Sequence, residues 1–211
     1  MNDWKKEFEA VGAIWVHDGN PKRPHAQLTS GMCSDGFVNC TLITQRPALL
    51  KRILTEPDGL SPQFPDAAQG ERVDWVIGSA LGAVSFSYAV AERLNAQSGY
   101  TEKDGEAMKL ARFEVAPKQW VLVVEDVIST GGSTLKTIEA IETSTSGQAS
   151  ICSFIVCLVN RSGKTHLGPH KIRSLITPDI HTWKPEECPL CKKGSKAVRP
   201  KSHWKELTAQ Y

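Results

Sequence analysis

The chain has 211 residues, of which 40% are hydrophobic, and its formal net charge at pH 7 is +2. A chain of this length buries one full core but hardly two, so we expect a single domain over residues 1–211. Because its apolar runs are too short to span a bilayer and its first residues lack a signal peptide's apolar segment, we expect a cytoplasmic protein without membrane contact.

Two amphipathic helices are predicted near the amino terminus. Trp4, Phe8, Val11 and Trp15 recur at helical spacing, and a second apolar pattern runs over residues 49–54. Three prolines then separate these helices from the next apolar segment, which indicates a connecting stretch.

Residues 28–39 read LTSGMCSDGFVN. A hairpin explains these letters, because glycine and aspartate favour tight turns. Phe37 also offers a flat ring that could stack on a planar ligand. The segment by itself leaves a structural hairpin and a binding segment both open.

A strand that runs into a turn of small residues is predicted where the chain reads DWVIGSALGA, residues 74–83. Small residues let a backbone approach an anion closely, and they equally allow tight packing between a helix and a sheet. Gly78 and Gly82 fit both roles. The turn is followed by apolar residues at helical spacing: Val84, Tyr88, Ala91 and Leu94.

The next segment, residues 100–113, is polar and reads YTEKDGEAMKLARF. Charged segments of this kind are typical of solvated surface loops. Its basic residues Lys103, Lys109 and Arg112 become candidates for a site only through the motifs around them.

Residues 120–134 hold the largest group of side chains suited to chemistry. The apolar run 121–124 predicts a strand covered on both faces, so Glu125 and Asp126 emerge at its carboxyl end, where open α/β sheets bind ligands. A turn then opens a helix, and its N–H groups, hydroxyls and helix dipole suit a phosphate. Two acids beside a phosphate site favour sugar hydroxyls or a divalent cation, so the pattern predicts a phosphorylated sugar. The residues of the turn are Ser129, Thr130, Gly131, Gly132, Ser133 and Thr134.

Another apolar run, residues 151–159, is followed by Asn160 and Arg161. Arg161 therefore lies near the carboxyl end of a predicted strand. A guanidinium pairs with both oxygens of a carboxylate. A turn arginine that faces water is the alternative.

The last segment, residues 181–211, is a basic tail with seven Lys or Arg and three Glu. It lacks the aromatic platforms or dense basic stripe of a nucleic-acid site, so we expect a docking or solvated terminus. Its Cys188 and Cys191 form a CxxC pair, for which His181 and His203 are candidate partners in a zinc site. One CxxC pair falls short of the two that structural zinc sites usually join, and free thiols are the alternative.

Together these elements predict an α/β fold with a mostly parallel central sheet flanked by helices. Residues 70–180 would form the core, and residues 1–60 a hood over the carboxyl edge of the sheet. Strands are expected near 73–77, 120–125, 151–159 and 172–176, and helices near 84–95 and 134–145.

The stretch 120–134 resembles the phosphoribosyl diphosphate signature of the type I phosphoribosyltransferases, a glycosyltransferase family. The resemblance implies that Glu125 and Asp126 hold the ribose 2- and 3-hydroxyls while the turn at 129–134 grips the 5-phosphate. It implies that the turn at Gly78 and Ser79 contacts pyrophosphate through backbone amides. It also implies a homodimer and Mg²⁺ carried by the substrate, with the two acids as candidate direct ligands.

Residues 28–39 are similar to the SGxxSxxY segment of the orotate phosphoribosyltransferases, with Phe37 where tyrosine is usual and Cys33 where histidine is common. In that branch an arginine in a (D)R segment takes the orotate carboxylate, a role that would fall to Arg161, although Asn160 stands where aspartate is usual. Some members also end in a CPLC-x-x-G segment like the one here. The resemblance gives four orotate-binding residues: Ser30, Phe37, Ser129 and Arg161.

The polar segment 100–113 resembles the mobile catalytic loop of this branch, which reads roughly F-x-E-R-x-x-G-x-M-x-L-R-R. Lys103 falls on its first basic position and is the expected loop cation, whereas Ala111 breaks the final basic pair. Lys109 and Arg112 are the alternatives for that cation and would contact phosphoribosyl diphosphate.

The implied reaction joins orotate to phosphoribosyl diphosphate and releases pyrophosphate and orotidine 5-phosphate, a step of pyrimidine biosynthesis. Two alternatives stay open. One is a phosphoribosyltransferase for another nucleobase, and the other is a regulator that binds phosphoribosyl diphosphate without catalysis.

Overall fold

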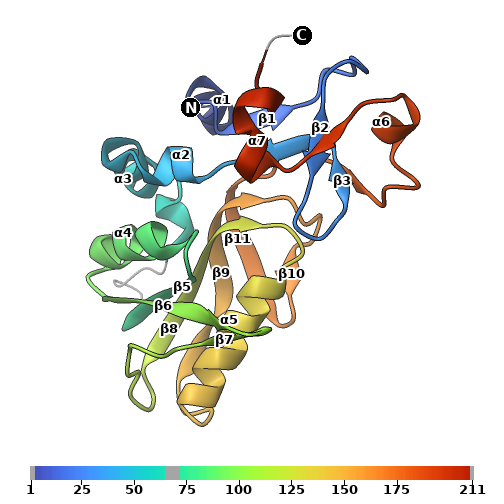
Figure 1. The fold of residues 1–211 in the computed structure, drawn as a ribbon. Helices are drawn as coiled ribbons and strands as arrows, with labels where there is room; N and C mark the ends of the chain where they lie inside the picture. Colours follow the sequence, from blue (N-terminus) through green and yellow to red (C-terminus); the bar gives the residue numbers. More distant parts are fainter. Residues whose placement is uncertain (1–2, 65–71, 210–211) are drawn as a thin grey trace. The chain divides into compact units, whose positions relative to one another are not determined.

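The computed structural model describes residues 3–64 and 72–209 (Figure 1). These residues form two compact units, and the single domain expected over residues 1–211 stays a prediction. Among the described residues, the core unit comprises Asp3, Trp4 and Cys40–Pro178, and the terminal unit comprises Lys5–Asn39 together with residues 179–209. None of the described helices is long and apolar enough to cross a membrane.

The core unit is built on a seven-stranded sheet with the order β10-β11-β9-β8-β5-β6-β7. The five strands from β11 to β6 run parallel, and β10 and β7 pair antiparallel at the two edges. A mostly parallel sheet is what the sequence predicts. Its strands are β5 (Trp75–Ser79), β6 (Gln97–Asp104), β7 (Ala107–Lys109), β8 (Trp120–Ile128), β9 (Ser150–Asn160), β10 (His166–Leu167) and β11 (His170–Ile176).

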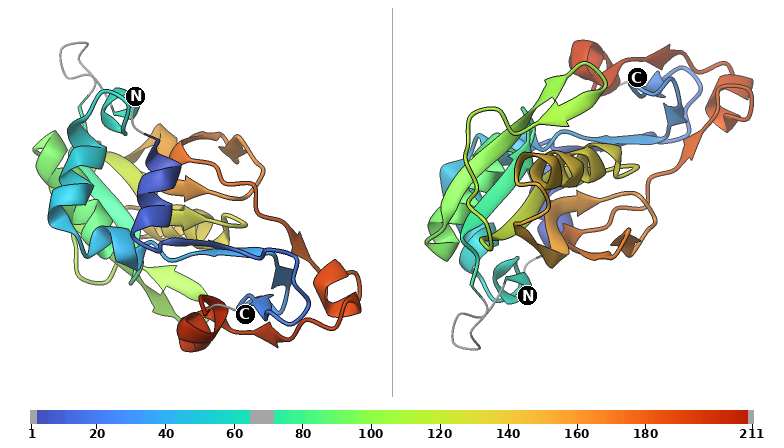
Figure 2. Two further views of the ribbon diagram at one scale, coloured as in Figure 1. Left: turned by 90° about the horizontal axis from the view of Figure 1, so that it is seen from above. Right: turned by 90° about the horizontal axis from the view of Figure 1, so that it is seen from below.

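Apolar strands explain why this sheet is buried on both faces. On one face Ile77, Val123 and Ile155 pack against Ile138 and Ile141 of α5 (Gly132–Ser144). The alternate residues of the same strands are also buried, because side chains along a strand point to opposite faces. The sheet curls around α5, which contacts β7 as well as β8 (Figure 2).

The other helices of the core unit are α2 (Thr41–Thr44), α3 (Pro47–Thr55), the 3₁₀ helix η1 (Ser61–Gln63) and α4 (Val84–Leu94). In α4 the predicted apolar face is partly wrong. Tyr88 is 67% exposed, whereas Ala91 is buried as predicted, together with Phe86, Ser87 and Val90. The helix turns by about 100° per residue, so this buried set forms one stripe that excludes Tyr88.

The polar segment 100–113 is a second correction, since most of it is not an irregular loop. Its first part belongs to β6, and β7 returns antiparallel to β6 through a turn at Gly105, where φ is +61°. The backbone groups of β6 and β7 hydrogen-bond to each other in this hairpin. The sequence did not indicate this pairing, because the segment is polar and lacks an apolar periodicity.

The terminal unit combines two segments that are far apart in the chain, residues 5–39 and 179–209. Its elements are α1 (Trp4–Ala10), β1 (Ile14–Val16), β2 (His25–Gln27), β3 (Cys33–Ser34), β4 (Gly36–Val38), β12 (Thr182–Trp183), α6 (Pro189–Lys192), β13 (Ala197–Val198) and α7 (Pro200–Leu207). β1 pairs with β4, and a second sheet has the order β12-β3-β2-β13. The predicted tail thus contributes strands to the same sheet as residues 25–34.

The first predicted helix is shorter than expected. It ends at Ala10, and Gly12 follows with a φ of +71°, a left-handed conformation that ends helices. Trp15 lies in β1, opposite Phe37 of β4. The segment predicted as a hood, residues 1–60, is divided between the units, with residues 5–39 in the terminal unit and residues 40–60 in the core unit. Its placement over the sheet stays a prediction.

Candidate active site

The strand connections of the core unit diverge between β5 and β8. From β5 the chain passes through α4 to β6 on one side, whereas from β8 it passes through α5 to β9 on the other. Such a switch in direction leaves a crevice at the carboxyl ends of the two strands, where open α/β sheets bind ligands. Ser79 ends β5, and Glu125 and Asp126 lie towards the end of β8.

Glu125 is almost completely buried at this point, with 4% of its surface exposed. The Ser79 hydroxyl lies 2.8 Å from each carboxylate oxygen, and the Thr134 hydroxyl lies 3.4 Å from Oε2. The carboxyl group therefore connects the end of β5 with the first turn of α5.

Burial raises the pKa of the Glu125 carboxyl from 4.5 to about 8, and the negative charge of the neighbouring Asp126 acts in the same direction. The hydrogen bond from Ser79 opposes this shift because it stabilises the charged form. Without a ligand, Glu125 is therefore mostly protonated at neutral pH.

This pKa shift predicts how stability depends on pH. The folded chain holds a proton on Glu125 that the unfolded chain releases, so the unfolding free energy of the ligand-free protein should fall as pH rises from about 5 to 8. Glu125→Gln keeps the shape without the charge and should be at least about 1 kcal/mol more stable than wild type at pH 9. Urea unfolding at several pH values measures both curves. The exposed Glu142→Gln is the matched control, and parallel curves for wild type and Glu125→Gln would contradict this origin of the pH dependence.

Asp126 lies beside Glu125, and its carboxyl group acts on that of Glu125 through its charge and a side-chain hydrogen bond. Its Oδ1 accepts a hydrogen bond from the backbone N–H of Val127 at 2.8 Å. A Cβ atom on Gly82 would lie only 2.7 Å from Oδ2 of Asp126, so the turn after β5 passes directly against this carboxylate. A side chain at this position would displace the Asp126 carboxylate. The sequence placed the two acids at the carboxyl end of a strand over residues 120–125. In the structure β8 continues to Ile128, so both acids lie within the strand.

The predicted phosphate turn connects β8 to α5. Ser129, Thr130, Gly132 and Ser133 are exposed, and Gly131 is the N-cap of α5. The N-cap Gly131 has no side chain that could cap this helix, and the Thr130 hydroxyl accepts a long hydrogen bond of 3.4 Å from the N–H of Gly132. An uncapped helix start with neighbouring hydroxyls can bind a phosphate group.

Gly131 has a structural requirement that Gly132 lacks. Its φ is +87°, and an added Cβ would lie 2.3 Å from Cδ2 of Leu167. Gly131→Ala should therefore destabilise the protein by about 1–3 kcal/mol. In Gly132→Ala the new methyl group meets only the Thr130 hydroxyl at 3.7 Å, so this control should change stability little. Thermal or urea unfolding compares the two variants, and equal stabilities would contradict the argument.

The turn after β5 shows the tight packing that its small residues allow. A Cβ atom on Gly78 would lie 2.8 Å from Cβ of Ala83, so Gly78 is explained by close packing. Leu81, by contrast, is 88% exposed at the tip of the turn. The backbone N–H of Ala80 donates to the carbonyl of Thr101 at 2.8 Å, which fixes the turn to β6. Contact of Gly78 and Ser79 with pyrophosphate stays a prediction.

Asn160 organises the turn that follows β9. Its Nδ2 donates to the carbonyl of Lys164 at 2.9 Å, and its Oδ1 accepts from the N–H and the hydroxyl of Ser162. An aspartate could not donate the first of these bonds. The N–H of Arg161 bonds the carbonyl of Ile128 at 2.9 Å, so the backbone of Arg161 lies beside the end of β8.

The three basic candidates are exposed on the hairpin of β6 and β7 or shortly after it. Lys103 and Lys109 are exposed, and the Arg112 guanidinium pairs with the Glu102 carboxylate at 2.8 Å. Thr101, at the base of the hairpin, shares a hydrogen bond of 2.8 Å with Thr137 of α5. The hairpin is thus attached to the helix that begins with the phosphate turn.

Ser30 and Phe37 belong to the terminal unit, so their roles in binding a base stay predictions. Ser30 is exposed in the tight turn between β2 and β3. Phe37 is half-buried on β4, and its ring lies 5.8 Å from that of Trp204 between centroids.

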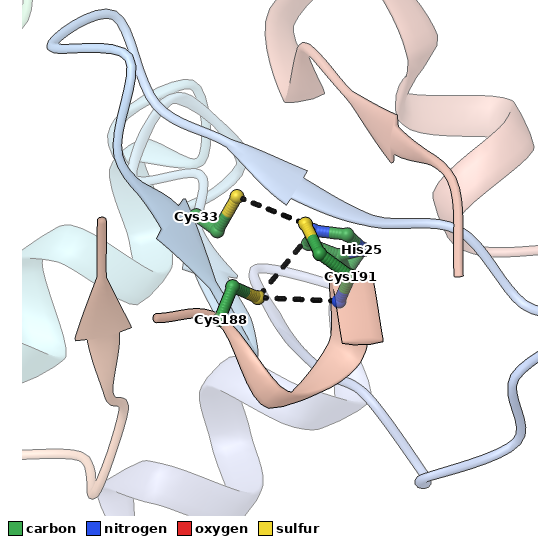
Figure 3. A group of neighbouring side chains, drawn as sticks. All are labelled: His25, Cys33, Cys188 and Cys191. Atoms are coloured by element: carbon green, nitrogen blue, oxygen red, sulfur yellow. Dashed lines mark hydrogen bonds between the residues drawn. The ribbon is translucent and has the colours of Figure 1, made fainter. Parts of the chain in front are cut away.

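The CxxC pair has neighbours that the sequence did not reveal (Figure 3). Cys188 and Cys191 lie beside His25 of β2 and Cys33 of β3. His181 is instead paired with Asp35 and stacked on Trp183, and the His203 ring bonds the carbonyl of Arg199. The proposed zinc partners His181 and His203 were therefore wrong, since spacing along the chain does not show which residues β2 and β3 bring to the pair.

Comparison with known proteins places the chain in a family, although no family model matches it. It is 39% identical over 183 residues to an orotate phosphoribosyltransferase of Caldicellulosiruptor bescii, a match that covers 86% of this chain and 90% of that protein. It is 36% identical over 196 residues to the orotate phosphoribosyltransferase of Desulforamulus reducens, covering 92% and 96%.

Solved structures agree with the fold. An orotate phosphoribosyltransferase from Aeropyrum pernix superimposes with a TM-score of 0.56 at 23% identity, covering 82% of this chain and 92% of that one. An adenine phosphoribosyltransferase from Saccharomyces cerevisiae gives 0.60 at 15% identity, covering 83% and 100%. These confirm the type I phosphoribosyltransferase fold, and from the identity and coverage of the sequence relatives the chain belongs to the orotate phosphoribosyltransferase family.

Proposed function

We propose that the chain transfers the 5-phosphoribosyl group of phosphoribosyl diphosphate to orotate, with Mg²⁺, to give orotidine 5-phosphate and pyrophosphate in pyrimidine biosynthesis. One observation carries the proposal beyond family membership. The acids Glu125 and Asp126 lie at the switch point between β5 and β8, and α5 begins beside them without a capping side chain. This arrangement suits a sugar that bears both hydroxyls and a phosphate.

The two acids have different roles in this proposal. Glu125 is buried and bonded to Ser79 and Thr134, so it holds the turn after β5 and the phosphate turn in register. Asp126 is half-buried, and its carboxylate accepts the ribose hydroxyls. Hydrogen bonds from both hydroxyls orient the sugar for attack at C1.

In the reaction the bond from ribose C1 to the pyrophosphate oxygen breaks as the orotate nitrogen approaches. Positive charge develops on the sugar, and the negative potential of Asp126 stabilises it. Negative charge develops on the leaving pyrophosphate, where the Lys103 ammonium group stabilises it. Closure of the hairpin over the site would exclude water, which otherwise hydrolyses the reactive sugar.

Mg²⁺ fits the oxygen ligands of this site. It takes carboxylate and phosphate oxygens, and Asp126 offers a carboxylate at the edge where the substrate phosphates would bind. When bound, the ion neutralises charge on the pyrophosphate.

Orotate is assigned to the carboxyl ends of β8 and β9. Arg161 supplies a guanidinium for the orotate carboxylate, and Ser129 supplies a hydroxyl, since the backbone of Arg161 lies beside Ile128 at the end of β8. Ser30 and Phe37 complete the base site in this proposal, with the Phe37 ring stacked on the pyrimidine.

The proposal includes a cytoplasmic homodimer whose hairpin completes the neighbouring site, as the family resemblance implies. The exposed position of Lys103 and Lys109 is consistent with a hairpin that acts on another surface. Sedimentation that showed only a monomer at working concentrations would contradict the dimer.

The decisive experiment measures base consumption with phosphoribosyl diphosphate and Mg²⁺, testing orotate beside uracil, adenine and hypoxanthine. We expect turnover of orotate alone, loss of activity with EDTA, and its return with excess Mg²⁺. Turnover of another base would assign a different specificity. Binding of phosphoribosyl diphosphate without turnover of any base would indicate a regulator and overturn the proposal.

A further inference from the structure

Four side chains in the terminal unit converge on one point. His25 of β2, Cys33 of β3, and Cys188 and Cys191 at α6 each offer one ligand atom, and these atoms all lie within 4.8 Å of one another (Figure 3). His25, Cys33 and Cys188 are buried, and Cys191 is half-buried. The group plays no part in the reaction described above.

The distances fit a tetrahedral zinc ion. With Zn–S bonds of about 2.3 Å and Zn–N bonds of about 2.0–2.1 Å, tetrahedral ligands lie about 3.8 Å apart for two sulfurs and about 3.6 Å apart for sulfur and nitrogen. Here the sulfurs of Cys33 and Cys191 are 3.7 Å apart. Nε2 of His25 lies 3.8 Å from the Cys188 sulfur and 3.4 Å from the Cys191 sulfur.

The surroundings of His25 fix the tautomer that a metal requires. Its Nδ1 lies 2.9 Å from the Ser195 hydroxyl oxygen, and that hydroxyl donates to the carbonyl of Arg23 at 2.6 Å. Since the hydroxyl proton is used in this second bond, Nδ1 is the donor to Ser195 and the lone pair of Nε2 points at the sulfurs. Metal-bound histidines are held by the same kind of outer hydrogen bond.

The CxxC turn is also arranged for a thiolate. The backbone N–H of Cys191 lies 3.5 Å from the Cys188 sulfur and donates to it. Leu190, Trp183 and Ala197 pack around the cysteines, so the sulfurs lie in an apolar surrounding.

We propose that His25, Cys33, Cys188 and Cys191 bind one structural Zn²⁺. The set is of the Cys₃His type with four protein ligands, which is the composition of closed structural sites. The ion would link β2 and β3 to a segment more than 150 residues later in the chain. A unit of roughly 70 residues with strands of two or three residues gains much from such a link.

Metal analysis of the full chain tests the proposal directly. Protein purified under reducing conditions without chelators should contain one zinc per chain. After removal of zinc, cobalt should bind with the intense visible bands of a tetrahedral thiolate site, and the unfolding temperature of the metal-free protein should be lower. Absence of stoichiometric zinc together with absence of such cobalt bands would overturn the proposal. A Cys33–Cys191 disulfide in the reduced preparation would overturn it as well.

Variants identify the ligands. Cys191→Ser should lower zinc affinity at least tenfold, and Ser195→Ala, which leaves all four ligands in place, should lower it about 10–100-fold. His181→Ala and Cys152→Ala are the matched controls and should keep their zinc. Loss of zinc from His181→Ala, or its full retention in Cys191→Ser, would contradict the assigned ligand set. After EDTA treatment, excess Mg²⁺ should restore turnover of orotate but cannot refill the zinc site. A failed zinc test and a failed activity test are therefore distinguishable.

Discussion

Replacing Asp126 with asparagine is expected to lower the kcat of orotate phosphoribosylation by about 100- to 1,000-fold. The amide keeps the size of the side chain but loses the negative charge that opposes the developing positive charge on the sugar. It also presents an NH₂ group where two hydroxyls need an acceptor. Steady-state kinetics with saturating phosphoribosyl diphosphate and Mg²⁺ measure the effect.

The same substitution should leave folding nearly intact. Asp126 is half-buried, and its oxygens lie beside Gly82 and the backbone N–H of Val127. In the asparagine variant the amide oxygen can still accept the hydrogen bond from this N–H. Unfolding of Asp126→Asn and of the exposed control Glu142→Gln should therefore give similar midpoints. An Asp126→Asn variant with unchanged turnover would remove this carboxylate from the mechanism.

The centre of the sheet and its loops could be predicted from the sequence because their signals are local. The apolar run at 121–124 and the helical spacing after Gly132 each lie within a few residues, so the strand, the turn and the helix follow from period and turn chemistry. The confirmed type I fold rests on these segments.

The remaining features depend on residues far apart in the chain. The extension of β8 to Ile128 requires the pairing of Val127 with Val159 and of Ile128 with Asn160. That extension keeps Glu125 and Asp126 inside the strand, with Glu125 opposite Cys157 of β9, which the sequence did not indicate. The zinc ligand set is likewise non-local, because two isolated residues, His25 and Cys33, have no spacing that identifies them.

The hairpin distinguishes Lys103 from Lys109, the two lysines that the sequence left as alternatives for the loop cation. Lys103 pairs with Met108, and Glu102 pairs with Lys109, so the side chains of Lys103 and Lys109 lie on opposite faces of the hairpin. Lys103 shares its face with Thr101, which bonds Thr137 of α5. Lys103 and Lys109 therefore do not point at the same pyrophosphate, whichever subunit of the proposed dimer holds it.

Lys103→Ala should consequently slow turnover by about 100-fold while the KM for phosphoribosyl diphosphate changes by less than about threefold, because the lysine acts on charge that appears only in the transition state. Lys109→Ala, from the opposite face, should mainly raise KM by a few fold. Neither exposed side chain contributes to the core, so the unfolding midpoints of both variants should match wild type. If Lys109→Ala gives the larger loss of kcat, the hairpin presents its other face to the pyrophosphate, and the assignment of Lys103 as the loop cation is wrong.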